Sequence, residues 1–152
     1  MKKLFALLCT CTLLGCSSAS SKKVDLKAVS TGIAAIQDAP AMMEMDQDSI
    51  NNFLSISAED YTEAACYMPL MNVTATEVIL FQYDSDSQKE KIQKGLDQRL
   101  EELENTWSQY LPAQYELVKN RTSIDADHVL GYCIGEDDFV KEVTSLITKN
   151  TK

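Results

Sequence analysis

The chain has 152 residues, of which 45% are hydrophobic and 24% charged, values typical of a single globular domain large enough to bury a core. Its formal net charge of −9, from 23 acidic and 14 basic residues, argues against nucleic acid as a partner, because that binding relies on Lys and Arg to neutralise phosphates. The same charge argues against a domain that lies flat on an anionic membrane.

The first fifteen residues have the layout of an export signal. Lys2 and Lys3 precede an apolar run of roughly a dozen residues. This run is too short to cross a hydrocarbon core about 30 Å thick, which takes a helix of about 20 residues. We therefore expect residues 1–15 to be a leader that is removed. Its removal would change the net charge from −9 to −11, because it carries two lysines and no acidic residue.

The end of the leader, Leu13-Leu14-Gly15-Cys16, resembles the lipobox of bacterial lipoproteins, in which a small residue precedes a cysteine that receives lipid. The resemblance implies that the Cys16 sulfur carries a diacylglyceryl group and that the leader is cut after Gly15. Two acyl chains suffice for stable anchoring. The alternative is an ordinary secretory leader whose cysteines are apolar filler. We expect the lipid on Cys16, which places the protein on the extracytoplasmic face of the cell membrane.

A short polar tether separates the lipidated cysteine from the rest of the chain. Residues 16–23 consist of Cys16 followed by small and polar residues without periodicity, and we expect a single domain over residues 24–152. Residues 17–23 span at most about 25 Å at about 3.5 Å per residue. The tether therefore predicts a domain that is held close to the membrane.

Two helices are expected in the first part of this domain. The first carries an apolar stripe with helical spacing and ends before Pro40. A loop with three methionines (residues 42–45) precedes a short helix over Ile50, Phe53 and Leu54. The methionines are interpreted as fillers of gaps in a core rather than as an adaptable binding surface. The stripe of the first helix consists of Leu26, Val29, Ile33 and Ile36.

Two strands and the longest helix follow. Residues 61–68 are expected to form a strand that stops at Pro69, and residues 77–83 form the clearest strand. The apolar residues of the second strand are consecutive, which predicts that both of its faces are covered. Ser87 and Glu90 predict a capping box at the start of the helix, which ends before Pro112. The apolar stripe of this helix consists of Ile92, Leu96, Leu100, Leu103, Trp107 and Leu111.

A hairpin and a last helix complete the domain. After a short helical turn, strands are expected near residues 119–124 and 128–134, and three carboxylates at residues 136–138 are expected at the start of a helix. The order of the main elements is α-β-β-α-β-β-α. This order predicts an α+β fold with a small antiparallel sheet of about four strands packed by helices.

Two cysteines remain once the leader is cut and Cys16 carries lipid. Cys66 and Cys133 both fall in expected strands of one sheet, in a compartment without cytosolic reductants. A disulfide needs Cα atoms within about 7 Å of each other. The sequence therefore leaves open a Cys66–Cys133 disulfide or two separate thiols.

Three stretches of the chain resemble a known family. They are residues 68–72 (MPLMN), 75–77 (ATE) and 110–120 (YLPAQYELVKN). They resemble the domain of unknown function numbered 4358, found in lipoproteins of Gram-positive bacteria, over roughly residues 25–150. The resemblance implies a lipid-anchored extracytoplasmic α+β domain, and it implies no activity and no functional residues. The position of Glu77 in front of an apolar strand has no explanation in the sequence.

No catalytic or metal site has a specific pattern in the sequence. His128 with Cys66 or Cys133 could form a thiol enzyme, but no local signature places a base beside a nucleophile. The acidic pairs at residues 84–86 and 125–127 lack the glycine and distal glutamate of a calcium-binding EF-hand loop and are interpreted as turns. We expect no cofactor and no metal.

Three classes of function remain. We expect a non-enzymatic binding module that engages an envelope protein or a small ligand, and no nucleic acid. The alternatives are a structural component of the envelope and, less favoured, an enzyme. A pocket with convergent polar groups would favour ligand binding, and an exposed apolar patch would favour a protein partner.

Overall fold

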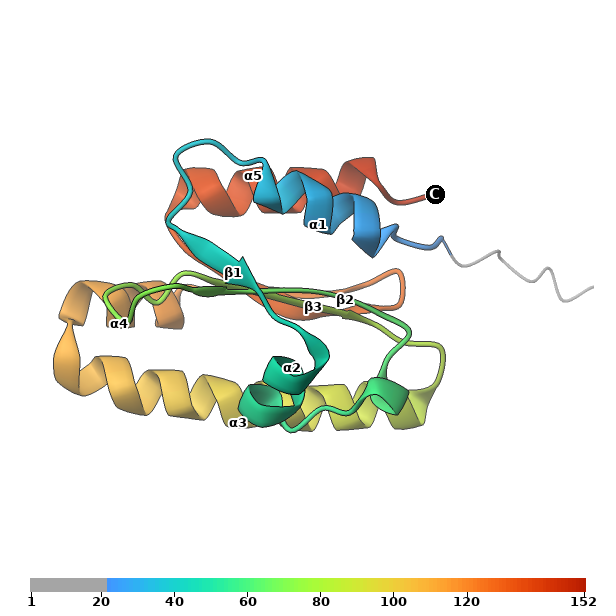
Figure 1. Ribbon diagram of the computed structural model, residues 1–152, viewed down its shortest axis with the longest axis horizontal. Helices are drawn as coiled ribbons and strands as arrows, with labels where there is room; N and C mark the ends of the chain where they lie inside the picture. The colour runs from blue at the N-terminus through green and yellow to red at the C-terminus, as the bar shows by residue number, and fades with distance from the viewer. Residues whose placement is uncertain (1–21) are drawn as a thin grey trace, which may run out of the picture.

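The computed structural model describes residues 22–152, which form three layers (Figure 1). An antiparallel sheet of five strands lies in the middle. Helices α1 (Leu26–Ala34) and α5 (Asp137–Lys149) cover one face of the sheet. Helices α2 (Gln47–Leu54), α3 (Asp86–Tyr110) and α4 (Pro112–Lys119) pack on the other face. The predicted α+β class is confirmed.

The sheet has the order β1-β2-β3-β5-β4. Its strands are β1 (Met42–Glu44), β2 (Glu63–Pro69), β3 (Glu77–Gln82), β4 (Thr122–Ala126) and β5 (Val129–Ile134), and a short 3-10 helix, η1 (Ala58–Asp60), precedes β2. All six residues of the central strand β3 are buried, as its consecutive apolar residues predicted. Its alternate side chains enter the two cores: Ile79 and Phe81 face α3, whereas Val78 and Leu80 face α1 and α5.

The sheet has one strand more than expected. Residues 42–44 were expected in a loop but form the edge strand β1, which pairs with residues 67–69 of β2. Three residues are too few to show the alternation by which a strand is recognised in a sequence. At the opposite edge, β4 begins at Thr122 rather than near residue 119, because α4 continues to Lys119.

Helix α3 begins two residues earlier than the predicted capping box implies. Its N-cap is Ser85, whose hydroxyl accepts a hydrogen bond from the backbone N–H of Gln88 at 3.3 Å. The helix ends as predicted before Pro112, since the residue before a proline is biased away from helical geometry and Leu111 is extended (φ −136°). Pro112 then opens α4, where its missing N–H costs nothing.

The two ends of the described chain are joined to each other. The N–H of Lys23 donates to the carbonyl of Lys152 and the N–H of Lys152 donates to the carbonyl of Lys23, both at 3.0 Å. Both ends of the described chain lie at the end of the molecule opposite the corner between α3 and α4 (Figure 1). The leader and Cys16 lie outside the described residues. Within residues 22–152, no helix combines the length and the apolar character that crossing a membrane requires.

The two remaining cysteines lie on opposite faces of the sheet. Cys66 of β2 packs in the core under α3, and Cys133 of β5 packs in the core under α1 and α5. Strand β3 lies between their strands. Both are buried free thiols, so the structure does not bear out the disulfide considered from the sequence. Side chains that project from opposite faces of two non-adjacent strands cannot bring their sulfur atoms into bonding distance.

A maleimide should therefore leave Cys66 and Cys133 unmodified in the native protein and modify both after unfolding. Burial raises the pKa of both thiols, that of Cys133 to about 12, so neither supplies a thiolate at neutral pH. Mass spectrometry of the protein before and after denaturation, without reductant, measures this. If both cysteines stay unmodified after unfolding and the protein mass is lower by two hydrogens, the two cysteines form a disulfide and the free thiols described here are wrong.

Candidate binding site

A cavity of about 420 Å³ opens between the loop that joins β2 to β3 (residues 70–76) and the C-terminal half of α3. Half of its lining residues are apolar and half are polar, and apolar side chains together with placed polar groups are what sites for small ligands combine. Its apolar lining consists of Met68, Pro69, Ala75, Leu103, Trp107 and Tyr110, and its polar lining of Asn72, Thr74, Glu77, Arg99, Glu102 and Thr106.

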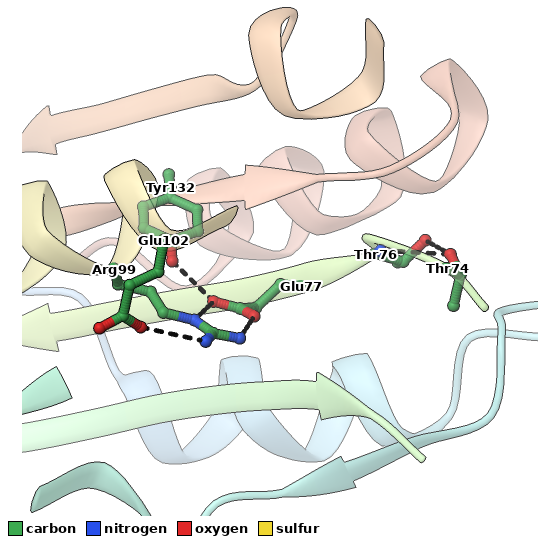
Figure 2. A network of polar contacts seen from close by, with 6 residues as sticks. All are labelled: Thr74, Thr76, Glu77, Arg99, Glu102 and Tyr132. Carbon is green, nitrogen blue, oxygen red and sulfur yellow. Dashed lines mark hydrogen bonds and ion pairs between the residues drawn. The ribbon is translucent and has the colours of Figure 1, made fainter. Parts of the chain in front are cut away.

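A buried ion pair lies in the wall of this cavity (Figure 2). Glu77, the first residue of β3, is 1% exposed, and its carboxylate accepts two hydrogen bonds from Arg99 of α3. Arg99 donates through Nη2 to Oε2 at 2.8 Å and through Nε to Oε1 at 3.3 Å. The hydroxyl of Tyr132, on β5, donates to the same Oε1 at 2.6 Å. Three elements thus meet at one carboxylate.

This network keeps Arg99 charged and Tyr132 neutral. Burial acts to lower the pKa of Arg99, but the hydrogen bonds and the negative charge of Glu77 outweigh it and hold that pKa above its ordinary value. Burial, reinforced by the Glu77 charge, raises the pKa of Tyr132 well above its ordinary range. A buried carboxylate with these three hydrogen bonds satisfies the requirement that a buried charge be paired. Glu77, unexplained by the sequence, thus fixes α3 to β3 and β5.

Hydrogen bonds hold the loop that forms the other wall. The side-chain oxygen of Gln114, on α4, accepts from the backbone N–H of Ala75 at 2.8 Å. The hydroxyl of Thr74 accepts from the backbone N–H of Thr76 at 3.2 Å and shares a second hydrogen bond with the Thr76 hydroxyl at 2.9 Å (Figure 2). Both walls are fixed by polar contacts, so the cavity is formed before any ligand arrives.

Exposed apolar side chains surround this end of the molecule. In the part of the chain that the structure describes, seven large hydrophobic side chains are exposed, and five of them lie in the 70–76 loop or at the corner between α3 and α4. The cavity therefore opens on a surface that is more apolar than the rest of this acidic protein. We call these five side chains the apolar rim: Leu70, Met71, Val73, Tyr110 and Leu111.

The other candidate residues from the sequence do not come together. His128 lies in the turn between β4 and β5 rather than at the start of a strand, with a positive φ of 63°, and its ring packs at a tilted angle against that of Tyr83. Cys66 and Cys133 are buried in the sheet, whereas His128 is exposed. Asp125 forms an ion pair with Lys89, whose Nζ donates to both carboxylate oxygens at 2.8 Å. Among residues 22–152, no three His, Cys, Asp or Glu side chains are placed to share a metal ion.

The sequence contained a signal for the buried pair. Arg99 lies three residues after Leu96 and four before Leu103, both buried, so it occupies a position on the apolar stripe of α3. A charge at such a position needs a buried partner. Glu77 lies at the start of a strand that is covered on both faces, and its carboxylate is the buried partner of Arg99.

Comparison with known proteins supports the resemblance noted in the sequence. The family model described as "Domain of unknown function (DUF4358)" matches residues 34–135, about two thirds of the chain. The matched segment includes every residue that lines the cavity. No curated protein and no solved structure matches the chain.

Proposed function

This chain belongs to the DUF4358 family, and for this member we propose the role of a lipid-anchored binding module on the extracytoplasmic face of the cell membrane. The cavity beside Trp107 is its binding site. The observation that carries the proposal is a cavity of about 420 Å³ whose wall holds a buried ion pair joined by two hydrogen bonds. Such convergence of apolar lining and fixed polar groups is typical of binding sites.

The position of the cavity agrees with an anchor at Cys16. The described chain begins at one end of the molecule, and the apolar rim lies at the other (Figure 1). A lipid attached before residue 22 would thus be attached at the end of the molecule opposite the apolar rim. The rim and the cavity would then be open to a partner or a solute in the space outside the membrane.

The residues that carry the family resemblance gather at this site. The first two stretches, 68–72 and 75–77, are neighbours in the sequence and the third, 110–120, is far from them, yet each contributes to the cavity lining. Gln114 of the third stretch also holds Ala75 of the second. A shared binding site would account for the presence of all three in one pattern.

A photoreactive phenylalanine analogue tests where the domain binds. Introduced at Tyr110, which lines the cavity and is 67% exposed, it should give an adduct when intact cells are irradiated. The matched control is Glu63, an exposed residue at the other end of β2. Intact-mass analysis detects both a protein adduct and a small-molecule adduct. Equal adduct yields at the two positions would contradict the proposed site.

Cys16 should carry lipid in the mature protein. When a lipoprotein-competent host is grown with a labelled fatty acid, the wild-type protein should take up label and the Cys16→Ser variant should not. Label retained by the serine variant would contradict lipid attachment at Cys16. Label found on Cys9 or Cys11 would place the lipid anchor at that cysteine instead.

A further inference from the structure

The charges of the side chains that line the cavity do not sum to zero. Glu77 and Arg99 neutralise each other through two hydrogen bonds, and the Tyr132 hydroxyl completes the shell of Glu77. Glu102, one turn further along α3, contributes another carboxylate to the lining. Its Oε2 lies 3.7 Å from Nη1 of Arg99, which is too long for a hydrogen bond, and its side chain is 52% exposed. The remaining lining residues are uncharged, so the cavity carries a net charge of one negative unit.

An aromatic and aliphatic surface lies beside this carboxylate. Trp107 and Leu103 are buried in the core on one side and line the cavity on the other, and Tyr110 stands at the mouth with its ring 6.2 Å from that of Trp107. Such a surface binds an apolar stem, and the faces of aromatic rings also attract cations. The side chains of Trp107 and Glu102 thus offer an apolar contact and an acceptor within one cavity.

We infer that the cavity binds a cation carried on an apolar stem, such as an alkylammonium or guanidinium group; this inference rests on the proposed binding function. The ammonium or guanidinium group pairs with Glu102, and the stem packs against Trp107 and Leu103. An anionic ligand is disfavoured, because it would meet the Glu102 carboxylate while Arg99 is already paired with Glu77. The chemistry is shared by a free cationic solute and by a Lys or Arg side chain of a partner.

Trp107 makes the test direct, because it is the only tryptophan in the chain and it lines the cavity. The purified chain, in micelles of a nonionic detergent, is titrated with butylammonium, butanol and butyrate while the indole emission is recorded. These probes share one apolar stem and differ in charge. Butylammonium should change the Trp107 emission with saturation and bind about tenfold more tightly than butyrate, since a like charge in the cavity is repelled.

Two variants separate the cavity charge from the general charge of the protein. Glu102→Gln should weaken butylammonium binding about tenfold. Glu101→Gln removes the same charge from the neighbouring residue, which is exposed and does not line the cavity, and should leave binding unchanged.

A blocked peptide, Ala-Ala-Lys-Ala-Ala, presents the same ammonium group on a backbone. If the peptide binds the protein more tightly than butylammonium does, a Lys or Arg side chain of a partner is supported as the natural occupant. If the two bind equally tightly, a free cationic solute is supported as the occupant.

Butyrate or butanol binding as tightly as butylammonium would overturn the inference while leaving the cavity as a binding site. Equal effects of Glu102→Gln and Glu101→Gln would overturn it in the same way. An indole emission that none of the three probes changes would also overturn it. The proposed function is judged separately, by the cross-linking at Tyr110, which depends on no assumption about ligand charge.

Discussion

Replacing Arg99 with methionine should lower the free energy of unfolding by about 3 to 5 kcal/mol, because the variant leaves the Glu77 carboxylate buried without its cation. Methionine keeps most of the volume and the unbranched shape of the arginine stem, so the loss reports on charge rather than on a void. Denaturant unfolding of the purified wild-type chain and the variant measures the difference.

Two further variants show whether the loss comes from the unpaired charge. Removing both charges, in Glu77→Gln with Arg99→Met, should cost clearly less than Arg99→Met alone, since no buried ion is left behind. Arg121→Met breaks the more exposed pair with Glu104, whose Nη1–Oε1 distance is 3.1 Å, and should cost no more than about 1 kcal/mol. If Arg99→Met costs as little as Arg121→Met, the Glu77–Arg99 pair does not fix α3 to the sheet.

Replacing Gly131 with alanine should lower the free energy of unfolding by about 3 kcal/mol or more, a large part of the roughly 5 to 15 kcal/mol by which domains are stable. Gly131 lies in the middle of β5 beside β3. A Cβ atom there would lie 1.9 Å from the carbonyl oxygen of Ile79 and 3.0 Å from the Cα of Leu80, and both are backbone atoms of the central strand. Neither can move without disturbing the pairing of β3 with β5.

Gly32 provides the matched control. Its added Cβ would meet only the side-chain tip of Leu146, at 2.5 Å, and a flexible side chain can move aside. Alanine also favours the helix α1 by up to about 1 kcal/mol over glycine. Gly32→Ala should therefore be close to neutral in the same denaturant experiment. A Gly131→Ala protein as stable as the wild type would mean that β3 and β5 are not packed as closely as described.

The main elements of the fold were predictable because each has enough residues to show its period. The stripe from Ile92 to Trp107 repeats over several turns of α3, and the unbroken apolar run of β3 indicated a strand covered on both faces. Strand β1 was missed because its three residues form a strand only through their pairing with β2. The N-cap was predicted at Ser87 but is Ser85, because local patterns place helix ends only to within a few residues.

The candidate site could not be assembled from the sequence in the same way. Its walls come from the 70–76 loop and from α3, and only the tertiary fold brings Glu77 of β3, Arg99 of α3 and Tyr132 of β5 to one point. The sequence left the Cys66–Cys133 disulfide open for the same reason, because only the tertiary fold places the two side chains. The sequence placed Cys66 and Cys133 in strands of one sheet, but the register of three strands decides which face each side chain takes.

The central claim is that the cavity between the 70–76 loop and α3 is where this protein binds. Filling it tests that claim most directly. Thr106 lines the cavity on α3 and is exposed, whereas its neighbour Asn105 is exposed but does not line it. In cells that carry the photoreactive residue at position 110, Thr106→Phe should remove most of the adduct, because the ring occupies the cavity, and Asn105→Phe should leave it. An adduct that survives Thr106→Phe undiminished would contradict binding in the cavity.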